Sequence, residues 1–301
     1  MSIRPKVLVA MLATALTLPA CSASLAESAG PAVQTGEQWA SSCKDWDEWD
    51  KPGPPYKIHG NTWYVGTCGI TALLVTGDEG HILIDTGTEK GSDAVLANVG
   101  KAGFDPKDIR VLLVSHEHHD HVGGAAHVLD FTGARLLGNA VVAAAMRNGN
   151  VAADDPQRAS HPAMRPVASV EAIDAGTPVT LGDLRLTMVP TPGHTSGASS
   201  WQWQSCEAGN CRTIVYADSL TPVSSGTYRF SDHPEYVAAF RRSIARVAAL
   251  DCDILLSPHP SASMMRDRLI SGSLAGGMSC GEYAKSVGAR LDERLAEENA
   301  K

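Results

Sequence analysis

Short runs of apolar residues, bounded by glycine, proline and other turn-forming residues, recur along most of the chain. Runs of this length, rich in valine, isoleucine and leucine, predict β-strands that end at the turn residues. They lie at residues 62–65, 70–75, 81–84, 111–114, 135–137, 178–181, 184–189, 199–204, 213–216 and 254–256. The polar and irregular residues 148–166 predict a surface flap instead.

Apolar residues spaced three or four apart predict helices between these strands. These segments are residues 91–102, 122–129, 140–146, 234–250 and 280–298. Helices among strands in both halves of the chain predict two sheets covered by helices, a layered α/β arrangement. Neither a linker nor a sequence repeat interrupts residues 61–251, so we predict a single domain over residues 37–301.

The N-terminus has the pattern of an export signal. Arg4 and Lys6 precede an uncharged apolar run, residues 7–18, which is too short to span a bilayer as a helix. We therefore predict export to the periplasm. The small and polar residues that follow, up to residue 36, predict a flexible arm.

The end of the signal leaves two outcomes open. Residues 18–21 read Leu-Pro-Ala-Cys, similar to the bacterial lipobox. In one outcome residues 1–20 are removed, and Cys21 carries a lipid that tethers the arm, residues 21–36, to the outer membrane. In the other, cleavage follows Ala23 or Ala26 and no lipid is attached.

Composition and charge exclude several classes of protein. Hydrophobic residues make up 44% of the 301 residues, enough for a core, which argues against a disordered chain. The chain has 25 basic and 33 acidic residues, a net charge of −8. This balance argues against non-specific nucleic-acid binding, which needs clustered lysine and arginine. No heptad pattern indicates an obligate protein partner, so we predict a monomer.

Six cysteines remain if Cys21 is lipidated or removed, and an even number in an oxidising compartment predicts three disulfides. Cys206 and Cys211 flank a turn-like sequence, Glu-Ala-Gly-Asn, and would close a hairpin. The local pairings for the others are Cys43–Cys68 and Cys252–Cys280. A cysteine metal site is the rival interpretation, but the sequence contains no Cys-x-x-Cys pair.

Four of the eleven histidines lie within residues 116–121, directly after a predicted buried strand. Because side chains alternate at a strand end, His116 and His118 point to the same side. Asp120 and His121 lie in the turn that follows. Imidazole and carboxylate are ligands that Zn²⁺ accepts, so the cluster predicts part of the ligands of two metal sites. Residues distant in the sequence must supply the others.

Two distant histidines also follow predicted strands. His194 lies in a tight Pro/Gly turn after residues 184–189, and His259 follows residues 254–256. A lone histidine is more often structural, but three loops of the same kind support one another as ligand loops. The histidines without this setting are interpreted as incidental: His59, His81, His127, His161 and His233.

The pattern His-x-His-x-Asp-His with distant single histidines resembles the metallo-β-lactamase superfamily over residues 61–259. The resemblance implies a four-layer αββα sandwich that holds two Zn²⁺ ions. It assigns the first ion to His116, His118 and His194, and the second to Asp120, His121 and His259. Asp85, in the sequence Ile-Asp-Thr-Gly, matches a family aspartate that supports the ligand loops.

Residues 216–222 separate branches of that superfamily. Glyoxalase II and the acyl-homoserine lactonases use an aspartate near here to bridge two metals, and two β-lactamase subclasses place a cysteine ligand here. This chain has Ser219 at the cysteine position and His121 as a compensating ligand, which is similar to subclass B3. Asp218 could still bridge metals, as in the lactonases. By resemblance, Ser219 and Thr221 would hold the substrate carboxylate.

The resemblance implies hydrolysis of the β-lactam amide bond, and with it resistance to β-lactam antibiotics, carbapenems included. A hydroxide held by two Zn²⁺ ions would attack the carbonyl, because zinc lowers the pKa of bound water to roughly 7. Asp120 would orient this hydroxide as well as bind metal. Two alternatives are a zinc hydrolase of the same fold that acts on a lactone or thioester, and a surface lipoprotein that only binds zinc.

Overall fold

The computed structural model describes residues 1–2 and 34–300. The apolar run of the predicted signal, Cys21 and both alternative cleavage positions lie outside the described residues. The chain divides into two units, Met1–Gly30 and Pro31–Lys301, and the fold below is that of the second unit. No helix in the described part of the chain combines the length and apolar composition needed to cross a bilayer.

Two mixed sheets lie at the centre of this unit. The first has seven strands in chain order: β1 (Tyr56–His59), β2 (Thr62–Tyr64), β3 (Leu73–Gly77), β4 (Gly80–Ile84), β5 (Ile109–Leu113), β6 (Arg135–Gly138) and β7 (Val170–Ala172). The second has five strands in the order β12 (Ile254–Leu256), β11 (Asn210–Tyr216), β10 (Ser199–Glu207), β9 (Leu184–Pro190) and β8 (Pro178–Leu181).

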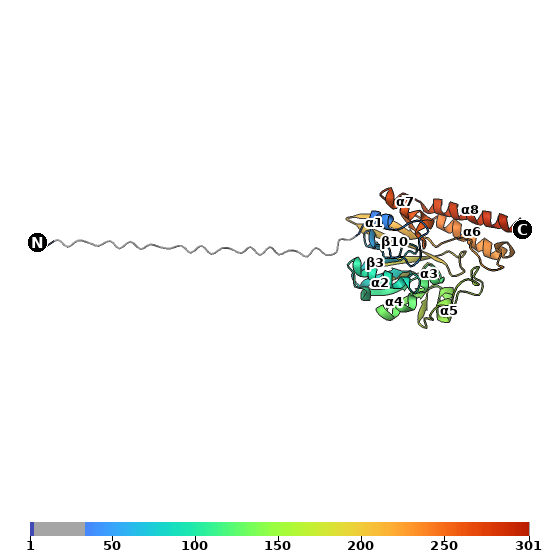
Figure 1. Cartoon of the computed structure of the whole chain (residues 1–301), viewed down its shortest axis with the longest axis horizontal. Helices are drawn as coiled ribbons and strands as arrows, with labels where there is room; N and C mark the ends of the chain where they lie inside the picture. The colour runs from blue at the N-terminus through green and yellow to red at the C-terminus, as the bar shows by residue number, and fades with distance from the viewer. Residues whose placement is uncertain (3–33, 301) are drawn as a thin grey trace. The chain divides into compact units, whose positions relative to one another are not determined.

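Helices cover the outer face of each sheet, which produces the four layers of the predicted αββα sandwich (Figure 1). The first sheet is covered by α2 (Gly91–Lys101), α4 (Ala125–Thr132) and α5 (Ala140–Asn148), and the second by α6 (Pro234–Ala248) and α8 (Cys280–Asn299). The short helices are α1 (Gly36–Ser42), α3 (His119–Val122), α7 (Met265–Ile270) and the 3₁₀ turns Pro106–Asp108, Phe230–Asp232 and Pro260–Ser263.

The central strands β4 and β5 of the first sheet carry apolar side chains on both faces because both faces are covered. In β4, Ile82 and Ile84 pack into the core between the sheets, whereas Leu83 packs against the outer helices. In β5, Leu113 packs into the core between the sheets, and Leu112 packs against the outer helices. This explains why these strands read as continuous apolar runs rather than as an alternation.

The strand directions bring several strand ends to common edges. β4 and β5 are parallel neighbours in the first sheet. In the second sheet, β9 and β11 both run antiparallel to β10, and β12 is parallel to β11. The carboxyl ends of β9, β11 and β12 therefore lie at one edge of their sheet, and those of β4 and β5 at one edge of theirs.

All three predicted cysteine pairs are disulfides in the structure. Cys43–Cys68 connects the end of α1 to the loop after β2. Cys206–Cys211 closes the β10–β11 hairpin, in which the two residues are directly paired. Cys252–Cys280 connects the approach to β12 with the first residue of α8.

The structure corrects the helix predicted over residues 122–129, which is two helices, α3 and α4, separated by Gly123 and Gly124. A Cβ atom on Gly124 would lie 2.3 Å from the Cβ atom of Ser92 at the start of α2. The glycine therefore allows this segment to approach α2 closely, at the cost of a continuous helix.

The last residues of the predicted arm join the fold. Gln34 forms a β-bridge with Tyr56, Thr35 caps α1, and Gly36 is the first residue of that helix. Residues 34–36 therefore belong to the folded unit, although they precede the predicted domain limit at residue 37.

Candidate metal centre

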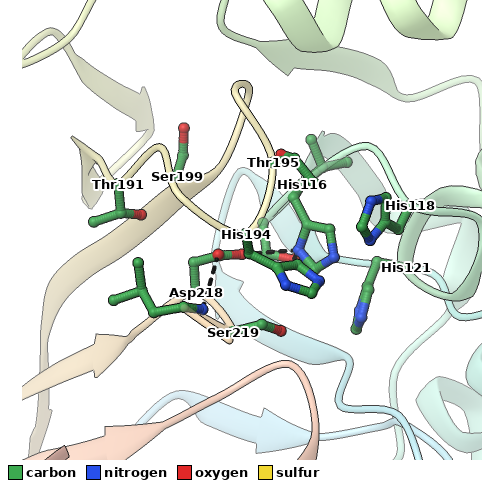
Figure 2. Close-up of polar contacts among 12 residues, drawn as sticks. His116, His118, His121, Thr191, His194, Thr195, Ser199, Asp218 and Ser219 are labelled. Atoms are coloured by element: carbon green, nitrogen blue, oxygen red, sulfur yellow. Dashed lines mark hydrogen bonds and ion pairs between the residues drawn. The ribbon is translucent and has the colours of Figure 1, made fainter. Parts of the chain in front are cut away.

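Loops at the carboxyl ends of strands from both sheets bring the predicted ligands together. His116 and His118 follow β5, His194 follows β9, and the ligand atoms of these three lie within 4.8 Å of one another. Ligand atoms of His116, Asp120 and His121 also lie within 4.8 Å of one another. Figure 2 shows the four histidines of these two groups turned toward one another.

Asp120 connects the second predicted ligand set. Its Oδ2 atom lies 3.2 Å from Nε2 of His121 and 3.4 Å from Nε2 of His259, which follows β12. The carboxylate and both imidazoles therefore converge on one point. The structure thus gathers all six residues predicted to be ligands at one end of the sandwich.

Hydrogen bonds determine which ring nitrogen of each first-set histidine is available. Nδ1 of His116 lies 2.8 Å from the Asp218 carboxylate, and Nδ1 of His194 lies 2.9 Å from the carbonyl oxygen of Thr221. Because a carbonyl oxygen only accepts, Nδ1 of His194 carries the proton. Nε2 of His194 is therefore left with its lone pair. Nε2 of His116 is buried and has no hydrogen-bond partner among the described residues.

The charge state of the centre suits a divalent cation. Burial is the main cause that lowers the pKa of His116 and His118 well below the usual value and that of His194 to about 3. Burial alone would raise the pKa of Asp120, but the charge and hydrogen bond of His121 hold it well below its usual value. Neutral imidazoles and an ionised carboxylate are the forms that bind Zn²⁺, so the first set and Asp120 fit the predicted metal. Burial alone would lower the pKa of His121, but the carboxylates of Asp120 and Asp85 raise it to about 10, so His121 would release its proton when a metal binds.

Asp85 supports the ligand loops, as the resemblance implied for it. One oxygen accepts from the Ser115 amide at 2.7 Å; the other accepts from the Ser115 and Tyr216 hydroxyls at 2.7 Å and lies 3.5 Å from Nδ1 of His121. The residue has a φ of +62°, which is uncommon outside glycine. Its contacts thus fix the approach to His116 and orient His121.

The structure turns Asp218 away from a bridging position. Its Oδ1 atom lies 2.8 Å from Nδ1 of His116, not from Nε2, the nitrogen of that ring without a hydrogen-bond partner (Figure 2). Its Oδ2 atom is directed to the Leu220 amide at 3.4 Å. Asp218 therefore holds His116 from behind, and the alternative left open by the sequence has no support in this geometry.

The predicted substrate contacts Ser219 and Thr221 lie beside the centre. The Thr221 hydroxyl lies 3.0 Å from Nδ1 of His194. Ser219 is buried, and the Tyr283 hydroxyl donates to the carbonyl oxygens of Asp218 and Ser219 at 2.9 Å each. The backbone of this segment is therefore held by α8, while the substrate roles of the two side chains stay predictions.

Three side chains of the flap, residues 148–166, contact the first-set histidines and were missed in the sequence. Asp155 Oδ2 lies 2.9 Å from Nε2 of His118, and Gln157 Nε2 lies 3.4 Å from Nε2 of His194. The ring of His161 stacks on that of His118, with centroids 3.8 Å apart and planes at 22°. The interpretation of His161 as incidental was therefore wrong: its ligand atom also groups with those of His118 and Asp120.

Two exposed tryptophans at the rim of the centre were also missed. The ring centroids of Trp46 and Trp49 lie 6.3 Å and 6.2 Å from that of His259. The Trp46 amide is fixed by the Ser261 hydroxyl at 2.7 Å. Both side chains are exposed. The sequence could not identify these tryptophans as part of the site, because exposure depends on the fold.

The fold and the paired His/Asp ligand sets define a metal-dependent hydrolase of the αββα type. The sequence model of the Metallo-beta-lactamase superfamily matches residues 65–259. The chain therefore belongs to the metallo-beta-lactamase superfamily.

Solved structures and a curated relative refine this placement. The chain is 53% identical to the MIM-2 metallo-beta-lactamase, with 88% of this chain and 98% of that chain covered and a TM-score of 0.83. It is 38% identical to MEM-A1, a subclass B3 metallo-beta-lactamase from a soil metagenome library (84% and 99% covered, TM-score 0.81). It is 29% identical over 248 residues to a hydroxyacylglutathione hydrolase of Anaeromyxobacter dehalogenans, covering 75% of this chain and 84% of that protein.

Proposed function

We propose that this protein hydrolyses the amide bond of β-lactam antibiotics, carbapenems included, with two zinc ions as cofactors. The observation that carries the proposal is the position of Asp218, which bonds to His116 from behind and leaves Asp120, His121 and His259 to form the second set. A second set built this way, with Ser219 where other subclasses have cysteine, matches the subclass B3 pattern. The similarity to MIM-2 and MEM-A1 supports the same assignment.

The chain's own residues would hold and orient the reacting groups. His116, His118 and His194 present neutral nitrogens to the first ion, and their far-side hydrogen bonds fix the ring directions. When bound, the zinc ions would supply a water activated near neutral pH and an electrophile for the carbonyl oxygen. The ionised Asp120 would hold that water in line with the carbonyl carbon.

The rim would bind the rest of the substrate. Trp46 and Trp49 offer exposed aromatic faces beside His259, suited to the apolar substituents of a β-lactam. Ser219 and Thr221 would receive the substrate carboxylate.

Because the substrate lies in the periplasm, export of the enzyme there would protect the cell. Comparing the antibiotic resistance of a host that expresses the full chain with that of one expressing the His118→Ala variant tests this step.

Hydrolysis of a carbapenem by the purified protein, with and without EDTA, tests the proposal. We expect turnover that stops on chelation and returns when zinc is added. The His118→Ala variant should be inactive while it keeps its three disulfides and its circular dichroism spectrum. Turnover that survives complete removal of metal, or an active His118→Ala variant, contradicts the proposed centre.

A thioester or lactone substrate is the competing assignment, favoured by the similarity to a hydroxyacylglutathione hydrolase. Parallel assays with a hydroxyacyl glutathione thioester and an acyl-homoserine lactone decide between the two. Zinc-loaded protein that opens either substrate but leaves β-lactams intact would replace the proposed substrate class and keep the metal centre.

A further inference from the structure

We propose that Asp155 is a positioning residue that holds His118 in its metal-binding orientation and so couples the flap, residues 148–166, to the metal centre. The inference rests on the metal centre proposed above but not on the identity of the substrate. It assigns a task to a flap residue that lies 37 positions from the ligand it contacts.

The two oxygens of the Asp155 carboxylate have separate partners. Oδ2 lies 2.9 Å from Nε2 of His118, and Oδ1 accepts from the Gln157 amide at 2.7 Å. The second bond closes a local turn that fixes the carboxylate relative to its own backbone. Asp155 is 3% exposed, so water does not compete for either bond. The carboxylate is therefore a rigid acceptor directed at His118.

His118 is held in two independent ways. The bond to Asp155 fixes the direction in which Nε2 points, and the stacked ring of His161, 3.8 Å away, fixes the plane of the imidazole. With Nε2 used for the bond to Asp155, Nδ1 is the nitrogen that remains for the metal beside His116 and His194. The flap thus determines both the available nitrogen of His118 and its direction.

Further bonds attach the flap to the loops around the centre. Asp154 Oδ1 accepts from the Ser196 hydroxyl at 2.9 Å, on the loop that carries His194. The Pro156 carbonyl oxygen accepts from the Ser225 amide at 3.0 Å. These bonds hold the flap, and Asp155 with it, against the loops around the centre. If they broke and the flap moved, Asp155 would lose its contact with His118.

Metal binding and flap order should strengthen each other. A cation on Nδ1 makes the Nε2–H group a stronger donor to a carboxylate. If the metal strengthens the bond to the flap, the flap strengthens metal binding by the same factor, because such coupling is reciprocal.

Zinc affinity of the Asp155→Asn variant tests the inference, and Asp154→Asn is the matched control. The asparagine at 155 can accept only one of the two N–H donors and presents its NH₂ group to the other. Asp154→Asn removes the same charge from the adjacent residue but keeps an oxygen for Ser196. By chelator competition we expect Asp155→Asn to lose about 10- to 100-fold in affinity and Asp154→Asn less than about 3-fold.

A structural role of Asp155 alone would lower the stability of the zinc-free protein without a specific loss of zinc affinity. Urea unfolding of both variants in chelator separates the two roles. Unchanged zinc affinity in a folded Asp155→Asn variant overturns the inference, and so does an equal loss in Asp154→Asn.

Hydrogen exchange of the unmodified protein provides a test that needs no variant. With zinc, we expect slower exchange of flap amides, including that of Gln157, than in chelator. Flap exchange that does not respond to zinc overturns the coupling. Failure of the unmodified protein to bind zinc at all would contradict the centre itself, so the two failures are distinguishable.

Discussion

Each histidine of the first predicted ligand set has one ring nitrogen in contact with a neighbouring oxygen, which leaves the other nitrogen for a metal. Asp218, Asp155 and the Thr221 carbonyl oxygen serve as these acceptors. A histidine without such a partner would rotate or exchange its tautomer, and its affinity for metal would fall. The identity of the acceptor therefore matters as much as that of the ligand.

Replacement of Asp218 by asparagine distinguishes support of His116 from bridging. Because the Asp218 carboxylate contacts Nδ1 of His116, we expect Asp218→Asn to lower the affinity for one zinc ion by about 10-fold or more and to leave the other bound. Metal analysis after titration with a chelator measures both. Loss of both ions together would show instead that Asp218 bridges them.

Two replacements of His161 separate stacking from metal ligation. Phenylalanine keeps an aromatic face against His118 but has no ligand nitrogen, whereas alanine removes both. If stacking is the function, His161→Phe should retain zinc affinity and His161→Ala should lose about 2- to 10-fold, the value of an aromatic pair. An equal loss in both variants would identify His161 as a ligand together with His118 and Asp120.

At the scale of elements, α8 connects the periphery of the fold with the centre. Ser279 and Glu282 form a capping box at its start, next to the Cys252–Cys280 disulfide. Tyr283, one turn further, holds the segment that carries Ser219. At the other end, Glu298 accepts from the amides of Phe230 and Ser231 at 3.1 Å and 2.7 Å.

The contacts of Glu298 predict an effect of pH on stability. Burial alone would raise its pKa, but the Ser231 amide, Arg294 and the Phe230 amide lower it. Because the folded-state pKa lies below the unfolded value of about 4.3, the stabilisation is present above that value and is lost as pH falls through the folded-state pKa.

Glu298→Gln should therefore lower the free energy of unfolding by about 1 kcal/mol at neutral pH, and the difference should disappear in acid. Urea unfolding at several pH values measures it, with the exposed neighbour replaced in Glu297→Gln as the control. A difference that persists in acid would mean that packing, not the charge, is responsible.

At the scale of the whole molecule, the metal centre joins the two sheets. His116 and His118 come from the first sheet, and His194 and His259 from the second. An ion bound by all of them connects loops that are otherwise held together by the core and by side-chain hydrogen bonds. Metal should therefore stabilise the fold as well as support catalysis.

Removal of zinc should lower the melting temperature reversibly. A ligand at 1,000 times its dissociation constant adds about 4 kcal/mol to the free energy of unfolding. Calorimetry with zinc, with EDTA and after zinc is restored measures this shift. The His118→Ala variant should show a much smaller response, and a zinc-independent melting temperature in the unmodified protein would contradict a bound metal.

The sequence by itself determined most strands, the disulfides and the candidate ligands of the histidine cluster, because each depends on local pattern. Apolar runs between turn residues marked β8 and β12 at their observed limits, and the nearest cysteines are the bonded ones. The His-x-His-x-Asp-His spacing likewise carries its chemistry in neighbouring positions.

Only the tertiary structure decided which side chains contact the predicted ligands from other segments. Asp155 and His161 belong to an irregular segment without periodicity, so no spacing relates them to His118. The sequence left Asp218 with two roles, because the direction of its side chain depends on how β11 and β5 are placed in opposite sheets. Local pattern selects the residue types, whereas contacts between distant segments exist only after the two sheets have packed together.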